Sequence, residues 1–366
     1  MTTIQDVARH AGVSVSTVSN VLNGRTDQMR ADTLARVEHA IKMLQFRPNK
    51  LARQLKTGQT PLLGLLVPSM ANPMYSYIAR EIEAIAQERF GYRLVIGSTH
   101  RTSDREASFF EDLLAHGVRH VIVISSLSDE RHIELAVERG MTVVSYDRPA
   151  TLGQPSLIEH VTPDNFEAAR LATEHLIRYG HTRLAFATVS GMTMSRSNKI
   201  RGFLAAAEHA GIQAGAHVFD SGPLEDYGDS VIAEVGYALA LQIANAPARP
   251  TGVVAVNDLL ALGLMAGLRE TGLQVPRDVS VVGIDGHFLS ALSNPMLTTV
   301  ELPVPEMARA MVERALRRRD ANTEVEATGC EAIFPPTRLI ERESVAPPPQ
   351  EGGPGAPQQP SATRNP

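Results

Sequence analysis

The chain has one cysteine, Cys330, no tryptophan, and few aromatic residues of any kind. A single thiol excludes a disulfide framework and a cysteine-based zinc site, and it fits a reducing compartment. The N-terminus lacks the apolar segment of a signal peptide, and Asn257 and Asp258 interrupt the most apolar stretch, residues 252–268. The sequence therefore predicts a cytoplasmic protein that does not span a membrane.

The sequence motifs of common enzymes are also missing. There is no G-x-G-x-x-G after a strand, no P-loop, no G-x-S-x-G and no H-E-x-x-H. The histidines are scattered, and acid pairs such as Asp147 and Asp285 are better interpreted as hydrogen-bond acceptors for ligand hydroxyls. We therefore predict no enzymatic activity, no catalytic residue, no cofactor and no metal site.

Charge is distributed unevenly along the chain. Residues 1–60 contain nine Lys and Arg against four acidic residues, whereas the remainder contains 26 basic and 36 acidic residues. A basic head on an acidic body is typical of a protein whose head binds a polyanion. A solvated basic face is the alternative, and charge alone does not separate the two.

The body combines apolar runs with amphipathic segments, and 43% of the whole chain is apolar. Near-continuous apolar runs predict strands that are covered on both faces. These runs are residues 62–67, 93–97, 120–125, 142–146, 183–188, 252–256 and 279–284. Helical patterns, such as those of residues 73–89 and 163–179, lie between them. This alternation predicts parallel sheets in two α/β lobes, with ligands bound beyond the carboxyl ends of the strands.

The head carries the local signals of three short helices. Thr3 and Asp6 have the spacing of an N-terminal cap, Gly12 provides a tight turn, and Ser14 caps a second helix. Residues 33–44 are expected to form the third helix. The second helix points its apolar side chains inward and leaves Val15, Ser16, Thr17, Ser19 and Asn20 toward solvent.

A recognition helix needs small and polar side chains of this kind to approach base edges in the major groove. The alternative is an ordinary three-helix subdomain without a nucleic-acid role. The basic charge, the glycine turn and the polar face together favour DNA binding.

The order of these motifs resembles the lactose-repressor (LacI/GalR) family of bacterial transcription regulators. The segments that carry the resemblance begin with IQDVARHAGVSVSTVSNVLNG and RPNKLARQLKTGQT and continue with LGLLVPSMANPMY, VVSYDRP, IRGFLAAAEHAGI, VVAVNDLLALGLMAGLRETGLQVPRDVSVVGIDG and NPMLTTVELP. Only the proline-rich tail lies outside it.

The resemblance implies an all-α helix-turn-helix head and an α/β two-lobed core like that of periplasmic binding proteins. The expected domains are the head (1–46), a hinge segment (47–60), the core (61–345) and a disordered Pro/Gly-rich tail (346–366). Within the core we expect an N-lobe of about 61–161 plus 292–321 and a C-lobe of about 162–291 plus 322–341.

The resemblance also assigns DNA-binding residues. Its base contacts fall on Val15, Ser16 and Asn20, and the assigned DNA-binding residues are Val15, Ser16, Thr17, Asn20, Asn49, Leu55 and Lys56. Leu55 matches the leucine that is wedged into the minor groove at the centre of the palindrome, which unstacks a base step. Without the head, Leu55 would be interpreted as a linker residue.

The family binds its effectors between the two lobes. The residues expected in this cleft are Met74, Tyr75, Asp147, Arg148, Asp164, Lys199, Asn257 and Asp285. Lys199 stands where the family usually has an arginine, which removes a bidentate grip on a sugar. With no tryptophan, stacking falls to Tyr75, Tyr146, Phe166 or a residue near Tyr227. An anionic ligand is therefore an alternative to a neutral sugar, and a helix-surface position is the alternative for Lys199.

The sequence thus predicts a DNA-binding transcriptional regulator, with repression favoured over activation. It binds double-stranded DNA at a palindromic operator as a homodimer, under the control of a sugar, a sugar acid or a small organic acid. The tail has no heptads, which argues against a tetramer. The alternatives are a cytoplasmic solute-binding protein and an architectural DNA-binding protein without effector control.

Overall fold

The computed structural model describes residues 2–22, 26, 29–46, 61–125, 131–146, 158–190, 193–222, 231–317, 331–336 and 338–350. Internal contacts divide the chain into two units, residues 1–60 and 61–366. The expected hinge segment, residues 47–60, lies outside the described residues.

The head contains the three helices that the sequence predicts. They are α1 (Ile4–Ala11), α2 (Val15–Leu22) and α3 (Ala31–Met43). The Thr3 hydroxyl accepts a hydrogen bond from the Asp6 amide at 3.3 Å, and the Thr3 amide donates to the Asp6 carboxylate at 2.9 Å. Gly12 ends α1 with a φ of 64°, a left-handed conformation that favours glycine.

The second helix of the head begins and packs as expected. The Ser14 hydroxyl accepts from the Thr17 amide at 3.1 Å and so caps α2. Val18 of α2 is fully buried against Val7 and Val37 of the other two helices. The helix-turn-helix architecture is confirmed.

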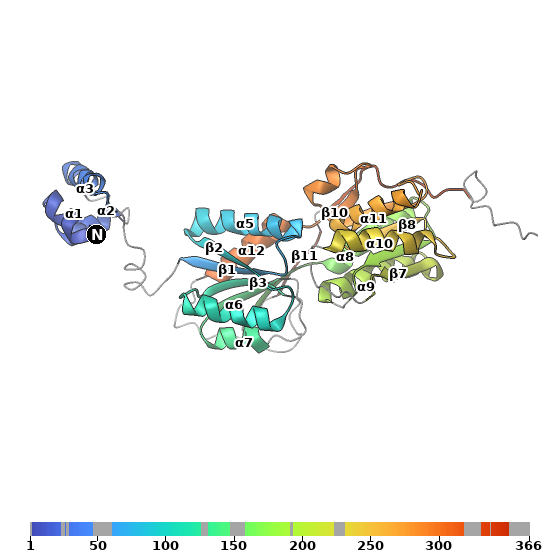
Figure 1. Ribbon diagram of the computed structural model, residues 1–366, viewed down its shortest axis with the longest axis horizontal. Helices are drawn as coiled ribbons and strands as arrows, with labels where there is room; N and C mark the ends of the chain where they lie inside the picture. Colours follow the sequence, from blue (N-terminus) through green and yellow to red (C-terminus); the bar gives the residue numbers. More distant parts are fainter. Residues whose placement is uncertain are drawn as a thin grey trace, which may run out of the picture. The chain divides into compact units, whose positions relative to one another are not determined.

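The first lobe of the core is a parallel sheet with the strand order β11-β5-β4-β3-β1-β2. Its strands are β1 (Leu62–Val67), β2 (Arg93–Ser98), β3 (His120–Ile124), β4 (Thr142–Tyr146), β5 (Glu159–Pro163) and β11 (Glu331–Phe334). Its helices are α5 (Pro73–Phe90), α6 (Ser103–Ala115), α7 (Arg131–Glu138) and α12 (Val304–Leu316). Helices α5 and α12 cover one face of the sheet, and α6 and α7 cover the other (Figure 1).

The second lobe repeats this arrangement, with the strand order β12-β10-β9-β8-β6-β7. Only β12, among these strands, is antiparallel to its neighbour. The strands are β6 (Leu184–Thr188), β7 (Ala216–Asp220), β8 (Gly252–Ala255), β9 (Ser280–Asp285), β10 (Thr298–Glu301) and β12 (Arg338–Ile340). The helices are α8 (Asn165–Arg178), α9 (Met194–His209), α10 (Ile232–Ala244) and α11 (Asp258–Glu270), with the short 3-10 helices η1 (Gln213–Gly215) and η3 (Phe288–Ala291).

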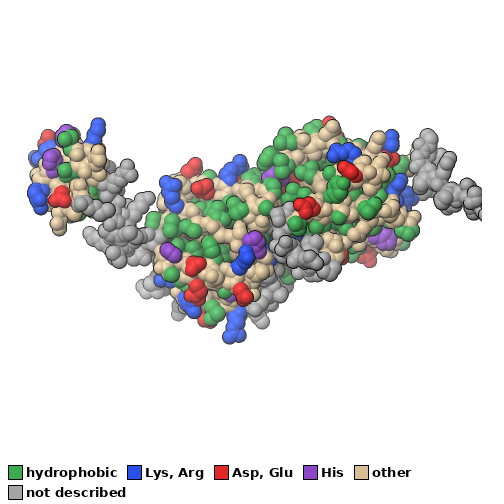
Figure 2. Space-filling model, in the orientation of Figure 1, with side chains coloured by type: hydrophobic (Ala, Val, Ile, Leu, Met, Phe, Trp, Pro, Cys, Tyr) green, Lys and Arg blue, Asp and Glu red, His purple; other side chains and the backbone are tan. Residues whose placement is uncertain are grey.

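Helix pairs cover both faces of the second sheet. α8 and α9 pack on one face, and α10 and α11 pack on the other. Figure 2 shows hydrophobic side chains over α10 and α11, where Tyr237 and Leu241 are exposed. The two-lobed α/β core that the sequence predicts is confirmed.

The predicted lobe boundaries are wrong in two places. Residues 298–301, placed in the N-lobe, form β10 and pair with β9 of the second sheet, where Thr298 and Val300 are fully buried. Residues 331–334, placed in the C-lobe, form β11 and pair with β5 of the first sheet. Both strands are short, and no pattern within four residues specifies a partner. The partner of β11 is distant in sequence, whereas β10 pairs with β9, the strand that precedes it along the chain.

The start of the tail also differs from the prediction. The carbonyl of Ala346 accepts hydrogen bonds from His181 Nε2 and from the Ser280 hydroxyl, each at 3.0 Å. These contacts attach residues just beyond Val345 to the second lobe, so the predicted disorder does not begin at residue 346. The remainder of the tail, residues 351–366, lies outside the described residues.

Candidate functional site

The exposed face of α2 is the candidate DNA-reading surface of the head. Val15 is 42% exposed, and Ser16 and Asn20 are exposed, whereas Thr17 is half-buried. The Ser14 hydroxyl lies 2.7 Å from the Ser16 hydroxyl and 2.8 Å from that of Thr17. These contacts gather three hydroxyl groups at the N-terminal end of the helix.

The other predicted DNA contacts fall on the hinge segment. Asn49, Leu55 and Lys56 lie outside the described residues. Their roles stay predictions.

The candidate effector site is a cleft between the two lobes of the core. It encloses about 620 Å³ of empty space, its open mouth included. Both lobes contribute side chains to it. The lining residues are Asn72, Met74, Tyr75, Arg101, Tyr146, Pro163, Asn165, Val189, Thr193, Ser195, Arg196, Lys199, Ile232, Val256, Asn257, Asp285 and Leu302.

Five of the eight predicted effector-binding residues line this cleft. They are Met74, Tyr75, Lys199, Asn257 and Asp285. Met74 and Tyr75 come from the first turn of α5, which Asn72 begins by accepting a hydrogen bond from the Met74 amide at 3.0 Å. Asp147 and Arg148 lie outside the described residues. Of the aromatic candidates for stacking, Tyr75 and Tyr146 line the cleft.

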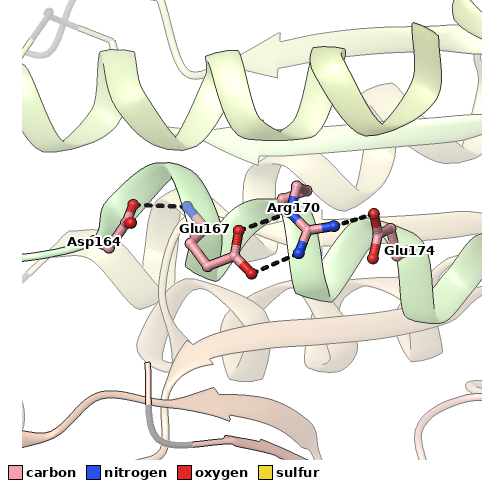
Figure 3. Close-up of polar contacts among 4 residues, drawn as sticks. All are labelled: Asp164, Glu167, Arg170 and Glu174. Atoms are coloured by element: carbon pink, nitrogen blue, oxygen red, sulfur yellow. Dashed lines mark hydrogen bonds and ion pairs between the residues drawn. The ribbon is translucent and has the colours of Figure 1, made fainter. Parts of the chain in front are cut away.

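Asp164 is not among the lining residues of the cleft. Its carboxylate caps α8 by accepting a hydrogen bond from the Glu167 amide at 2.9 Å. Figure 3 shows that this cap begins a chain of contacts along the helix, in which Arg170 bridges Glu167 and Glu174. The neighbouring Asn165 lines the cleft instead.

Lys199 belongs to the cleft rather than to a helix surface. Its side chain is only 7% exposed, and its ammonium donates a hydrogen bond to the Val256 carbonyl at 2.9 Å. That carbonyl precedes Asn257, whose side chain caps α11 by accepting from the Leu260 amide at 2.9 Å. The contact thus links α9 to the loop that begins α11.

Asp285 ends β9 in an uncommon backbone conformation. Its φ is 146°, and it is followed by Gly286 with a φ of 73°. Positive φ is costly for a residue with a side chain and is concentrated at binding sites. Asp285 is one of the residues that line the cleft.

Several lining residues were missed by the sequence analysis. Arg196 lies three residues before Lys199 on α9, so helical spacing already places the two on neighbouring positions of one face. Arg101 follows the carboxyl end of β2, where a parallel sheet binds its ligands. Neither residue belongs to one of the motifs from which the cleft residues were predicted.

A buried carboxylate, Asp258, directly follows the cleft residue Asn257 in the chain. It is 2% exposed, and it accepts hydrogen bonds from the His287 amide at 2.8 Å and from the Thr299 hydroxyl at 2.5 Å. Burial raises the pKa of Asp258 to about 6, although these hydrogen bonds and the charges of Arg342 and Lys199 act in the opposite direction. The pKa of His287 is lowered by burial, against the effect of its hydrogen bond to the Pro73 carbonyl of the first lobe.

The raised pKa of Asp258 predicts a pH-dependent stability. The folded state binds the proton more tightly than the unfolded state, so the contribution of Asp258 to the free energy of unfolding falls as pH rises from about 4 to about 6. The fall is at most about 3 kcal/mol. The Asp258→Asn variant should lack this dependence of the free energy of unfolding on pH. The free energy of unfolding of the variant minus that of the wild type should therefore rise from about pH 4 to about pH 6. Urea unfolding at a series of pH values measures the difference, with the exposed Asp112→Asn as the control. A difference that does not change with pH would contradict the raised pKa.

The fold and the two surfaces define a class of protein. A helix-turn-helix head joined to a two-lobed binding core is the architecture of a ligand-responsive DNA-binding regulator. Residues 3–49 match the lacI family of bacterial regulatory proteins, and residues 173–345 match a periplasmic binding protein-like domain.

Similar proteins agree with this class. The chain is 31% identical over 350 residues to the HTH-type transcriptional regulator GalS of Salmonella typhimurium, covering 94% of this chain and 97% of that protein. It is 33% identical over 320 residues to the ribose operon repressor of Escherichia coli, covering 87% of this chain and 93% of that protein. The fold matches the lac repressor dimer bound to operator and the anti-inducer ONPF with a TM-score of 0.77 and 26% identity, covering 94% of this chain and 99% of that chain.

The chain belongs to the lacI family of bacterial regulatory proteins. It is a DNA-binding transcriptional regulator, and the relatives named above are transcriptional regulators too. No helix in the described part of the chain is long and apolar enough to cross a membrane.

Proposed function

We propose that the protein represses transcription by binding a palindromic operator as a homodimer, and that a small molecule in the interlobe cleft controls this binding. The observation that carries the proposal is that one chain combines an exposed, polar recognition helix with a cleft lined by both lobes. A DNA target places its action in the cytoplasm. We propose no catalytic activity.

The recognition helix supplies the base contacts. Val15 is suited to a thymine methyl group, Ser16 to either a donor or an acceptor, and Asn20 to adenine. Thr17, Asn49 and Lys56 are proposed as further DNA contacts, and Leu55 as a wedge in the minor groove. Phosphate contacts hold the register, and the base contacts provide the sequence preference.

Dimerisation follows from the palindrome, because two-fold symmetry in the site requires two-fold symmetry in the protein. Phe288, the first residue of η3, and Leu292, which follows η3, are 66% and 72% exposed, the highest values among the large apolar side chains of the described residues. We propose that these two apolar side chains lie against the second copy in the dimer.

Control by a ligand follows from the position of the cleft. A ligand that contacts both lobes favours the lobe arrangement in which both sets of contacts are made. A coupling of about 1–3 kcal/mol to the DNA-bound state is typical of such control. The relatives support a sugar-like effector, since one is named a ribose operon repressor and a similar structure is a CelR-cellobiose complex.

The two alternative functions each leave one part of the chain without a role. A solute-binding protein does not use the helix-turn-helix head, and an architectural DNA-binding protein does not use the cleft. Regulation by a ligand uses both parts.

The test is to sequence the genomic fragments that the purified protein retains at near-physiological salt, because salt sets the non-specific background. Retention of a few sites that share a palindrome beside one operon is the expected result. The enzymes of that operon then nominate the effector. Broad retention without a shared motif, unchanged by a cell metabolite extract, would support the architectural function instead.

Asn20→Ala is expected to lower affinity for the operator by about 10- to 100-fold through loss of one bidentate base contact. The preference at a single base-pair position should relax, while binding to unrelated DNA changes little. Fluorescence anisotropy with the operator and with single-position variants measures both effects. His39→Ala, an exposed substitution on α3, is the control. Equal losses on operator and unrelated DNA would contradict a base-reading role.

A further inference from the structure

A hydrogen bond joins the two lobes beside the cleft. The ring of His287, in the loop that follows β9, donates it to the carbonyl of Pro73, the first residue of α5. His287 is only 6% exposed, and neither residue is among those that line the cleft. Both residues border a second hollow, of about 220 Å³ with its open mouth included, and Asn72, Met74 and Asp285 line both hollows. The contact therefore adjoins the cleft and leaves the cleft free for a ligand.

The two ring nitrogens of His287 have different partners. Nδ1 accepts a hydrogen bond from the Leu289 amide at 3.3 Å, which caps η3. A nitrogen that accepts carries no proton, so a neutral imidazole has its proton on Nε2 and donates from there to the Pro73 carbonyl. Burial lowers the pKa of His287, which favours this neutral form. One nitrogen thus serves the second lobe and the other serves the first.

The backbone of the loop that carries His287 is fixed to the second lobe. The His287 amide donates to the Asp258 carboxylate at 2.8 Å, and the Gly286 amide donates to the Thr299 hydroxyl at 3.2 Å. The Thr299 hydroxyl in turn donates to Asp258 at 2.5 Å. These contacts fix the backbone from which the ring extends, so the bond to Pro73 is expected to break when the first lobe moves away.

The two segments that this bond joins also carry cleft residues. Pro73 is followed by Met74 and Tyr75 in the first turn of α5, and His287 lies two residues after Asp285. A ligand that contacts Tyr75 on one side and Asp285 on the other needs the two segments at a fixed separation. A hydrogen bond that holds this separation in advance lowers the cost of binding, as preorganisation generally does.

We propose that His287 is a positioning residue for regulation, whose hydrogen bond to Pro73 stabilises the lobe arrangement of this structure and so contributes to operator affinity. The inference rests on the proposed function, in which the lobe arrangement controls DNA binding. One hydrogen bond shifts an equilibrium between two arrangements by about two- to tenfold. Such a shift overlaps the lower end of the coupling that is typical between two sites.

Two substitutions of His287 separate the interlobe contact from the local structure. Asparagine places a carbonyl oxygen near the position of Nδ1 and is a favoured N-cap residue, so His287→Asn keeps the cap of η3 but is too short to reach Pro73. Glutamine places an amide donor near the position of Nε2, so His287→Gln keeps the interlobe donor but loses the cap. His217→Asn, an exposed substitution on β7 of the same lobe, is the matched control.

Hydrogen–deuterium exchange of the full chain without ligand, followed by mass spectrometry, measures the opening of each segment. In His287→Asn, residues 74–77 of α5 should exchange about two- to tenfold faster, whereas residues 287–292 should keep the wild-type rate. In His287→Gln the pattern should be reversed. His217→Asn should exchange like the wild type in both segments.

Fluorescence anisotropy with the palindromic operator tests the functional part of the proposal. His287→Asn should change operator affinity by about two- to tenfold, and His287→Gln should restore the wild-type affinity although its η3 lacks the cap. A side chain that acted only through local folding would give the opposite ranking, because asparagine preserves the local structure and glutamine does not.

Each remaining outcome decides against a stated part of this account. Wild-type exchange of residues 74–77 in His287→Asn would overturn the proposal, and so would an operator affinity unchanged in that variant. Equal effects of His287→Asn and His287→Gln would show a purely structural role and would also overturn it. If the wild type itself retained no palindromic operator, the proposed function would be refuted, whereas the exchange rates would still decide whether His287 holds the lobes together.

Discussion

Leu55→Ala is expected to weaken binding to the palindromic operator by about 100-fold, and binding to unrelated DNA by less than about threefold. A leucine that separates two base pairs at the centre of the operator stabilises a bent duplex and widens the protein contact. Alanine is too short to separate them, so the protein loses the contacts that the bend permits. Non-specific binding depends on phosphates and has no use for the wedge.

Lys50→Ala provides the contrast. Lys50 is a cation of the predicted hinge segment, and we expect it to contact a DNA phosphate. Its removal should therefore lower affinity for operator and unrelated DNA alike and should reduce the salt slope by about 1. Filter binding or anisotropy on both DNAs, over a range of salt concentrations, separates the two patterns. If Leu55→Ala also reduced both affinities equally, Leu55 would not act as a wedge.

The parts of the fold that the sequence predicted are those that short segments determine. Thr3 and Asp6 form their capping box, and Gly12 adopts the positive φ of a turn, because both features depend on neighbours within a few residues. The apolar run of residues 62–67 is β1, with every residue after Leu62 buried. A parallel strand covered by helices on both faces leaves no other environment for such a run.

The parts that could not be predicted depend on distant partners. Glu331 pairs with His160, so the strand that contains it belongs to the first sheet although its neighbours along the chain continue into the second. No periodicity within residues 331–334 specifies that partner. Residues 298–301 differ, because their partner β9 is the strand that precedes them along the chain, but their own four residues do not specify that pairing either.

The cleft shows the same division. Lys199, Asn257 and Asp285 were found because they lie in motifs, and the structure brings them together on one cleft. Arg101 was not predicted as a cleft residue. Its backbone is left-handed, and the sequence has neither a glycine nor an asparagine at this point to indicate that conformation. Arg196 could have been predicted from the sequence, because it lies three residues before Lys199 and therefore on the same face of the helix.

Gly263→Ala is expected to destabilise the second lobe by about 3 kcal/mol or more, because the added methyl group meets backbone that has no alternative rotamer. A Cβ atom at Gly263 of α11 would lie 1.8 Å from the carbonyl oxygen of Ala233 in α10. Across the same interface, a Cβ atom at Gly236 would lie 2.1 Å from the Leu260 carbonyl oxygen. The two helices are therefore in backbone contact, and even the smallest side chain must push them apart.

Helix propensity alone predicts the opposite change in the free energy of unfolding, so the experiment separates the two effects by the sign of that change. Alanine in a helix interior is favoured over glycine by about 1 kcal/mol, so Gly263→Ala would stabilise the protein if packing did not matter. Urea unfolding decides between the two, with Leu241→Ala on the exposed side of α10 as the control. Because α11 begins at Asp258, directly after the cleft residue Asn257, displacement of the helix should also weaken effector binding. A stabilised variant with unchanged effector affinity would show that the contact between α10 and α11 adapts without cost. A destabilised variant that also binds the effector more weakly would show that Gly263 holds one wall of the cleft in place.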